Sequence, residues 1–377
     1  MKFQPESIPK FRESDTLISD RPPLLCMITR VICAHSQSGH RQRKNKPYIH
    51  LDNLFAYIIC EPNIDIMFGD TFKSFAINLD GLNGRNVFTC GDFISGRIVF
   101  DLSKEMRVNS INVSLKGKAK VAWSTGSRKH RRHYSAREDY FNIKCDILQH
   151  NAIGAGETVL RSGAHEYPFR TRLPEGNFPS SFQGVHGRVV YALVVQIHRP
   201  WHLAKEFRSE LNFVSHIDAN HPQLLAPLSA SNDKELCCLC CTSGPISMNC
   251  RLDRKGYVQG EMIQIIAEFE NASSRTLVPR ATLVQTQTFY TYSRLSKRCV
   301  PKNLVKVEGT PVMPYCSGVW GNQMLQIPAN IPLTISNCQI LEVDYFLMVS
   351  LCIPNGTNLS VIFPLIMCSI PVCRPPA

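Results

Sequence analysis

The stretch at residues 94–101, Ile94-Ser95-Gly96-Arg97-Ile98-Val99-Phe100-Asp101, alternates between apolar and polar side chains. In an extended chain Ile94, Ile98 and Phe100 lie on one face of the backbone. The polar residues of the stretch, Ser95, Arg97 and Asp101, lie on the opposite face. The alternation therefore predicts a β-strand that buries one face and exposes the other to solvent.

The same period of two returns along most of the chain from Lys73 onward. The alternating segments are Ile111–Leu115, Ile143–Leu148, Val189–Ile197, Ile263–Phe269, Val343–Leu351 and Leu359–Leu365. The turn signals that separate them are Asp80-Gly81, Asn83-Gly84, Leu173-Pro174-Glu175-Gly176 and Pro354-Asn355-Gly356. No helical stripe exceeds two turns. The sequence therefore predicts an all-β fold of the sandwich or barrel class.

An internal repeat favours two domains over one large sheet system. Phe88–Ile94 and Tyr257–Ile263 each hold an aromatic residue, a Gly-acidic turn and the start of an apolar strand. Later in each half a proline-bearing loop leads into a long strand, in which Tyr191 corresponds to Tyr345. Such turn residues are common in any β-sandwich, but two echoes in the same order indicate duplication. We therefore expect two tandem β-sandwiches.

The repeat and the local composition divide the chain into five parts. Residues 1–70 lack a regular period and are expected to form an extension of uncertain order. Residues 71–217 and 244–372 are the two expected sandwiches. Residues 218–243 begin with a stretch rich in Pro, Ser, Asn and Ala, and are expected to form the linker. Residues 373–377 are expected to form a short tail.

The composition is that of a globular protein with a surplus of basic residues. Of 377 residues, 44% are apolar and 19% are charged, and 42 Lys and Arg against 30 Asp and Glu give a net charge of +12. Such a surplus favours acidic receptor segments, anionic membrane surfaces or nucleic acid as partners. No apolar run approaches the roughly 20 residues that a membrane helix needs.

The expected cellular compartment determines whether the cysteines are free thiols or form disulfides. The start of the chain, Met1–Asp15, is polar and mixed in charge, unlike a secretory signal. We therefore expect a cytoplasmic protein whose 16 cysteines are free, mostly buried thiols.

The sequence lacks the common catalytic signatures. It holds no Gly-rich phosphate loop, no HExxH and no nucleophile elbow, and its histidines are scattered. We therefore expect no enzymatic activity, no catalytic residues, no cofactor and no metal.

Ordered motifs in both halves are similar to those of the α-arrestins, the arrestin domain-containing protein family. Those of the first half are Gly91-Asp92, Ile94-Ser95-Gly96, Leu115-Lys116-Gly117-Lys118-Ala119, His165-Glu166-Tyr167-Pro168-Phe169, Leu173-Pro174, Pro179-Ser180-Ser181-Phe182-Gln183-Gly184, Val190-Tyr191 and Arg199-Pro200-Trp201. Those of the second half are Ser243-Gly244-Pro245-Ile246, Leu252-Asp253-Arg254-Lys255-Gly256-Tyr257, Phe269-Glu270-Asn271 and Val278-Pro279. None of these residues is arranged for chemistry, and we interpret them as scaffold.

The resemblance implies a non-enzymatic adaptor made of two immunoglobulin-like, arrestin-type β-sandwiches joined by a short linker. Family members engage cytoplasmic parts of receptors and transporters at the plasma membrane and endosomes. Their Pro-Pro-x-Tyr motifs bind WW domains of HECT-type ubiquitin ligases, which links cargo to ubiquitination and endocytosis.

This sequence departs from the family pattern at two places. It holds no Pro-Pro-x-Tyr motif, because Pro22-Pro23 is followed by Leu24 and Pro375-Pro376 by Ala377. This argues against direct recruitment of a HECT-type ligase. The thioredoxin-interacting branch uses a cysteine just after the Phe-Glu-Asn stretch, where this chain has Ala272-Ser273-Ser274. We therefore do not expect thioredoxin binding by that route.

The adaptor role leaves two alternatives open. One is a tail-less regulatory scaffold that competes or dimerises with ligase-recruiting arrestins. The other is a cargo-sorting or lipid-binding protein of the retromer-related arrestin fold.

The cluster Cys237, Cys238, Cys240 and Cys241 has three interpretations. Palmitoyl chains on these cysteines could hold the adaptor at a membrane. The cluster could also bind a metal ion with Cys250 as an extra ligand, although adjacent cysteines suit a tetrahedral site poorly. The third interpretation is a buried strand start in which cysteine acts as a small apolar residue.

The basic run Ser127–His133 is expected on a long hairpin loop. Its cations Arg128, Lys129, Arg131 and Arg132 could contact an anionic lipid surface. A solvated loop is the alternative, since charge runs are usually exposed. The run lacks interleaved aromatic residues that would stack on bases, so we do not expect nucleic-acid binding.

Overall fold

The computed structural model describes residues 71–80, 87–127, 130–149, 158–238 and 241–373. All of them fall in one compact unit, Phe55–Ala377. The extension expected at residues 1–70 and most of the expected tail, residues 374–377, lie outside the described residues. Within the described ranges no helix is long and apolar enough to cross a membrane.

The first sandwich pairs a small sheet with a larger one. The small sheet has the order β1-β3-β8, and the larger has the order β2-β11-β10-β5-β6, with β9 also paired to β10. The strands β4 and β7 form a separate ladder. The bounds are β1 Phe72–Leu79, β2 Val87–Phe88, β3 Phe93–Leu102, β4 Met106–Val108, β5 Ser110–Thr125, β6 Arg132–Gln149, β7 Thr158–Leu160, β8 Gly163–Arg172, β9 Phe182–Gln183, β10 Gly187–His198 and β11 Lys205–Phe213. Aromatic contacts join the two sheets, since Phe75 of β1 stacks on Phe207 of β11.

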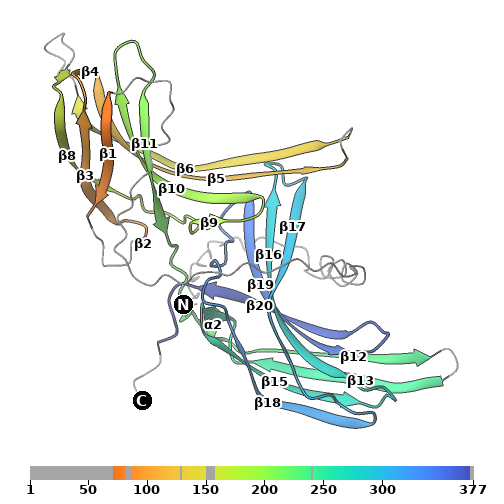
Figure 1. Cartoon of the computed structure of the whole chain (residues 1–377). Helices are drawn as coiled ribbons and strands as arrows, with labels where there is room; N and C mark the ends of the chain where they lie inside the picture. The colour runs from red at the N-terminus through yellow and green to blue at the C-terminus, as the bar shows by residue number, and fades with distance from the viewer. Residues whose placement is uncertain (1–70, 81–86, 128–129, 150–157, 239–240, 374–377) are drawn as a thin grey trace, which may run out of the picture. The chain divides into compact units, whose positions relative to one another are not determined.

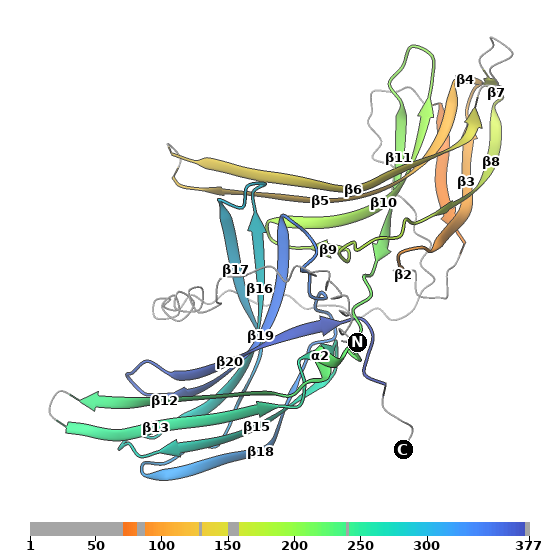
Figure 2. The same cartoon turned by 180° about the vertical axis from the view of Figure 1, so that it is seen from behind.

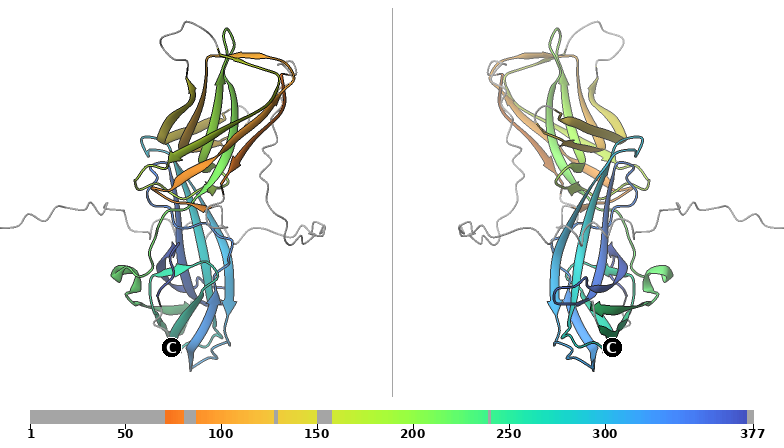
Figure 3. Two further views of the ribbon diagram at one scale, coloured as in Figure 1. Left: turned by 90° about the vertical axis from the view of Figure 1, so that its left-hand side faces the viewer. Right: turned by 90° about the vertical axis from the view of Figure 1, so that its right-hand side faces the viewer.

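The second sandwich repeats this plan. Its sheets have the orders β12-β13-β15-β18 and β14-β20-β19-β16-β17. The bounds are α2 Pro222–Leu225, β12 Leu228–Cys238, β13 Cys241–Leu252, β14 Gly256–Val258, β15 Met262–Asn271, β16 Val278–Tyr290, β17 Lys297–Glu308, β18 Cys316–Gln326, β19 Leu341–Cys352 and β20 Leu359–Cys368. Among the described strands, no sheet mixes β1 to β11 with β12 to β20 (Figure 1, Figure 2 and Figure 3).

The alternation that predicts the fold is confirmed in β3. Ile94, Ile98 and Phe100 are buried, and Arg97 between them is exposed. The apolar face of β3 is part of the hydrophobic core. Burial of every second side chain therefore produces the period of two that predicts a β-sandwich.

The internal repeat appears as two matching turns. Thr89–Asp92 and Val258–Glu261 each hold a glycine with positive φ, 78° at Gly91 and 80° at Gly260. In each turn the closing acidic side chain accepts a hydrogen bond from the first backbone N–H, at 2.8 Å in the first turn and 3.0 Å in the second. A glycine adopts this left-handed conformation without steric strain, so the Gly-acidic pair is a structural requirement of each repeat.

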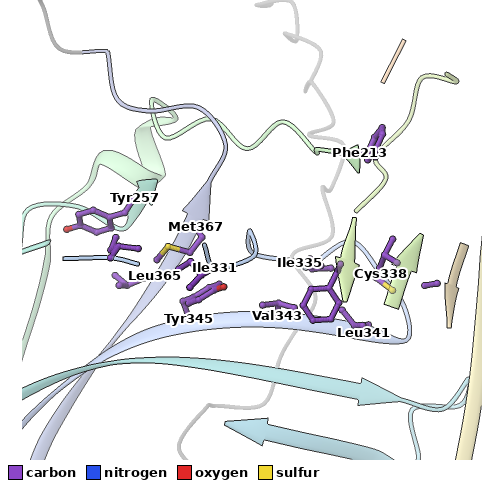
Figure 4. Packing of buried hydrophobic residues seen from close by; sticks show 14 of the residues in the cluster. Phe213, Tyr257, Ile331, Ile335, Cys338, Leu341, Val343, Tyr345, Leu365 and Met367 are labelled. Carbon is purple, nitrogen blue, oxygen red and sulfur yellow. The ribbon is translucent and has the colours of Figure 1, made fainter. Parts of the chain in front are cut away.

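A second matched pair is the tyrosine of each long strand. The Tyr191 hydroxyl donates to the carbonyl oxygen of Pro179 at 2.7 Å, and the Tyr345 hydroxyl donates to that of Pro332 at 2.6 Å. Tyr345 also accepts from the buried Gln285 side chain at 2.7 Å. Figure 4 shows Tyr345 in the core beside Leu365, its partner on the neighbouring strand. A tyrosine hydroxyl therefore hydrogen-bonds each proline-bearing loop to the long strand that follows it.

The two tyrosines predict unequal effects of removing a hydroxyl. We expect Tyr345→Phe to lower the free energy of unfolding by about 2–3 kcal/mol, because a buried and a half-buried partner each lose a hydrogen bond. Tyr191→Phe, which affects the Pro179 carbonyl alone, is expected to cost about 1 kcal/mol. Urea unfolding of both variants measures the difference, and equal losses would contradict this account.

The expected linker, residues 218–243, is wrong for most of its length. Residues 228–238 form β12, which pairs with β13 in the second sandwich. β12 is an edge strand, and its residues 231–233 are exposed. An edge strand buries little apolar surface, so it shows no period of two and is easily mistaken for a linker.

The true connection is tied to the far end of the chain. The Ile217 amide donates to the Ser369 hydroxyl at 2.8 Å, and the Ser369 amide donates to the Ile217 carbonyl at 3.0 Å. Asp218 forms a parallel bridge with Ile370. Residues after β20 therefore hold the segment that leaves the first sandwich.

Candidate functional site

One face of the β5–β6 hairpin is lined with lysines. Lys116, Lys118 and Lys120 occupy alternate positions on β5, so they project from the same face of the sheet. Leu115 and Ala119 between them are buried in the core. The lysines therefore belong to the outer face of the larger sheet of the first sandwich.

Arginines on three neighbouring strands extend this row. Arg188 of β10 and Arg137 of β6 both lie opposite Lys120, one on each side. Arg208 of β11 lies opposite Val194 of β10. The resulting surface, called the basic face below, comprises Lys116, Lys118, Lys120, Arg137, Arg188 and Arg208.

The positive charge of the basic face is only partly compensated. Arg137 Nη2 lies 2.6 Å from Asp139 Oδ1, and Arg208 Nη2 lies 3.6 Å from Glu210 Oε1. The other four members form no ion pair with any residue that the structure describes. Burial, followed by the charges of the surrounding basic face, lowers the pKa of Lys118. An anion bound here would relieve that repulsion.

A pocket opens at one end of the basic face. Its volume is about 610 Å³, and its lining includes Lys120, Arg137, Arg188 and residues 183–187. Tyr292 of the β16–β17 turn closes one side, where its hydroxyl accepts from the Arg137 amide at 3.2 Å and donates to the Arg137 carbonyl. No Asp or Glu lines this pocket. The pocket therefore suits an anionic group.

The basic run at the hairpin end continues this surface. Arg131 Nε donates to the Ser124 hydroxyl at 3.0 Å, and Ser124 shares a face with Lys120. Arg132 begins β6 and is exposed opposite Thr125. Arg128 and Lys129 lie outside the described residues. Contact of this run with an anionic surface stays a prediction.

The expected long loop at this run is instead a short connection between long strands. Trp123 and Tyr134 lie opposite each other near the end of the hairpin, and their rings stack with centroids 5.3 Å apart. Such a cross-strand aromatic pair stabilises the strands up to their last residues. Of the cations of this run, Arg132 therefore lies on a paired strand.

The cysteine cluster lies at the free end of the β12–β13 hairpin (Figure 1). Cys237 and Cys238 end β12, and Cys241 begins β13 opposite Cys238. Cys240 lies outside the described residues. S-acylation of the cluster and its burial as small apolar residues both stay predictions.

The metal interpretation with Cys250 is wrong. Cys250 is buried in the core of the second sandwich, nine residues along β13 from Cys241. A strand rises about 3.3 Å per residue, so roughly 30 Å separate the two positions. Within the described ranges, no group of His, Cys, Asp and Glu could hold a metal ion. Among the cysteines whose side chains the structure describes, nine are free thiols, of which three are buried, four half-buried and two exposed.

Comparisons with known proteins agree with this architecture. Residues 75–220 match the family described as "Arrestin (or S-antigen), N-terminal domain", and residues 242–372 match the corresponding C-terminal domain. Arrestin domain-containing protein 4 of Mus musculus is 33% identical over 293 residues, which cover 76% of this chain and 70% of that protein. The chain belongs to the α-arrestin family. Thioredoxin-interacting protein of Sus scrofa is 30% identical to this α-arrestin over 299 residues, 78% of this chain and 74% of that protein.

Family membership fixes the general role of this α-arrestin. Arrestins act as adaptors that bind other proteins, and they are generally not enzymes. The stretch after Phe269-Glu270-Asn271, where the sequence lacks a thiol, lies at the end of β15. There Asn271 and Ser273 are buried and bonded to each other, as expected for scaffold.

The basic face is the part of the site that sequence reasoning missed. Lys116 and Lys118 belong to the motif Leu115–Ala119, which we interpret from the sequence as scaffold. That interpretation fits only the buried positions of the motif, because the two lysines lie on the outer face of the sheet. The signal was present, because lysines at 116, 118 and 120 share one strand face. What the sequence could not show is that β10 and β11 bring Arg188 and Arg208 beside them.

Proposed function

We propose that this α-arrestin is an adaptor in membrane-protein trafficking, and that its basic face binds acidic segments in the cytoplasmic parts of receptors or transporters. The observation that carries the proposal is a set of four cations, Lys116, Lys118, Lys120 and Arg188, that form no ion pair with a carboxylate among the residues described by the structure. They lie on the adjacent strands β5 and β10 of one sheet, so the backbone fixes their positions before a ligand binds.

The physical basis is electrostatic complementarity on a rigid surface. An acidic segment gains attraction from several cations at once, and it also relieves the repulsion that lowers the pKa of Lys118. Because these side chains are partly exposed, the interaction should weaken as the salt concentration rises above about 0.1 M, where the Debye length falls below about 10 Å. The adjoining pocket offers a place for one carboxylate or phosphate group of the segment.

The finer form of the proposal concerns the fate of the cargo. We propose that binding occurs at the plasma membrane and endosomes, and leads to endocytosis of cargo linked to its ubiquitination. The competing forms are a scaffold that withholds cargo from ligase-recruiting arrestins and a retromer-type sorting protein. Cargo ubiquitination on expression of the protein separates them: it rises for delivery, falls for competition and does not change for sorting.

Charge reversal on the basic face tests the binding step. The triple variant Lys118→Glu, Lys120→Glu, Arg188→Glu is expected to bind a fluorescent acidic peptide about 50-fold more weakly, because attraction becomes repulsion at three contacts. The measurement is fluorescence anisotropy against a 15-residue peptide rich in Asp and Glu, with its Asn and Gln counterpart as the reference ligand.

A matched control changes the same net charge elsewhere. Lys297, Arg298 and Lys302 are exposed cations of β17, on the second sandwich. Their replacement by Glu should leave peptide affinity within about threefold of the unchanged protein, the effect of long-range charge alone. Equal weakening by both triple variants would mean that net charge, and not the basic face, attracts the peptide.

A further inference from the structure

The turn between β10 and β11 exposes two large apolar side chains. Trp201 has a relative exposure of 101% and Leu203 one of 84%. The other two tryptophans of the chain, Trp123 and Trp320, are buried, at 7% and 8%. A fully exposed tryptophan leaves a large apolar surface in water, so its position calls for a partner.

The turn holds Trp201 outward in a defined conformation. The His202 amide donates to the Arg199 carbonyl at 3.4 Å, and His202 Nδ1 lies 2.6 Å from the Pro200 carbonyl. Trp201 has a φ of 55°, in the left-handed region that bulky residues rarely adopt. The turn lies at the free end of the β10–β11 hairpin (Figure 1). The ring is therefore presented at an end of the sandwich and does not pack on it.

The surroundings of the turn are basic. Lys205 begins β11, with its amine 4.5 Å from the centre of the Phe72 ring. Burial and the charge of Arg199 lower the pKa of Lys205. Lys104 and Arg161 are exposed and belong to two neighbouring turns, because Met106 pairs with Leu160. These turns lie at the same end of the sandwich as residues 199–204, since the amide of residue 109 donates to the carbonyl of residue 198. One acidic residue, at position 105, lies in these turns.

We propose that this turn, residues 199–204, is a membrane contact that places Trp201 and Leu203 in the interface of an anionic bilayer. Tryptophan prefers the boundary between lipid headgroups and acyl chains, where its ring is apolar and its N–H stays hydrated. Leucine adds apolar area, and the surrounding cations attract anionic headgroups. A protein pocket would also cover the two apolar side chains, but it would not need the cations of the neighbouring turns.

This contact is separate from the proposed binding of cargo. Arg188 and Lys120 lie near the first residue of β10 and the turn follows its last, His198, so about 33 Å of strand separates the pocket end of the basic face from the turn. Arg208, the member nearest the turn, lies three residues after Lys205 and is left unchanged in the basic-face triple variant. A weak contact of this kind would keep the adaptor beside the membrane in which its cargo is embedded. The two surfaces can be tested one at a time.

Tryptophan fluorescence gives a direct readout, because Trp201 is the exposed tryptophan. Adding vesicles of phosphatidylcholine with 30% phosphatidylserine should shift the emission to shorter wavelength and protect it from acrylamide, as Trp201 leaves water. Vesicles that carry brominated acyl chains should quench the same emission. Pure phosphatidylcholine vesicles should give a smaller effect, since they lack the charge.

Sedimentation with the same vesicles tests the residues. Trp201→Gly with Leu203→Ser should reduce the bound fraction about tenfold, and Gly accepts the positive φ of position 201, so the turn is preserved. Trp201→Phe should retain most of the binding, because the ring keeps its apolar area. The matched control is Leu295→Ser, which removes a side chain of similar exposure, 88%, from a turn of the second sandwich.

The outcomes decide the proposal without reference to cargo. Binding that survives the double variant, or an emission spectrum that vesicles do not change, would overturn it. Loss of binding in Leu295→Ser to the same degree would show nonspecific apolar adsorption and would also overturn it. The basic-face triple variant should sediment with vesicles as the unchanged protein does if the turn dominates the contact.

Discussion

Replacing Arg254 by alanine is expected to lower the free energy of unfolding by about 3–5 kcal/mol. Arg254 is buried, and its guanidinium bonds to Glu261, to Asp253 at 3.2 Å and to the Gly256 carbonyl at 3.2 Å. It also lies over the ring of Tyr257, 4.5 Å from its centre. Without the guanidinium, the half-buried Glu261 carboxylate loses its cationic partner, which is the costly way to break a largely buried pair.

The control is an exposed pair in the same sandwich. Arg280 Nε lies 2.9 Å from Glu308 Oε1, and both side chains are accessible to solvent. Arg280→Ala should therefore cost at most about 1 kcal/mol. Urea unfolding followed by circular dichroism measures both variants. If Arg254→Ala cost no more than its control, the Arg254 network would be a surface feature and not a part of the core.

This network also explains why the second half carries a Gly-acidic turn. Glu261 accepts the Val258 amide and binds Arg254 at the same time, so the turn and the buried cation stabilise each other. The first half uses Asp92 in the turn, where the hydroxyl and amide of Thr89 are its partners. The two copies of the repeat thus share the backbone geometry of the turn, but the acidic side chain has different additional partners in each copy.

The sequence predicts those parts of the fold in which burial dictates side-chain type. β3 and β15 bury every second residue, so their alternation identifies them and their repeat identifies two sandwiches. β12 escapes this reasoning because it lies at an edge with residues 231–233 exposed. Its pairing depends on backbone hydrogen bonds to β13, which leave no pattern in the side chains.

The candidate site was harder to predict because it is assembled across strands. Lys120 and Arg137 lie on successive strands, but Arg188 reaches Lys120 only because β10 pairs with β5. Periodicity reports which residues share a face of one strand, and it says nothing about strand order. The cations at the hairpin end were visible as a run, whereas the row of lysines was hidden inside a scaffold motif.

Replacing Asn271 by alanine is expected to cost about 3 kcal/mol of the free energy of unfolding, because its buried amide satisfies several groups at once. Its Nδ2 donates to the carbonyls of Arg275 at 2.7 Å and Met313 at 2.9 Å, and its Oδ1 accepts from the Ser273 amide and hydroxyl at 3.1 and 2.6 Å. Alanine would leave these buried and half-buried groups without their partner. Asn249→Ala, an exposed change on the paired strand β13, should cost less than about 0.5 kcal/mol. Similar losses in urea unfolding for the two variants would refute the role of Asn271 as the fastener between the end of β15 and the segment before β18.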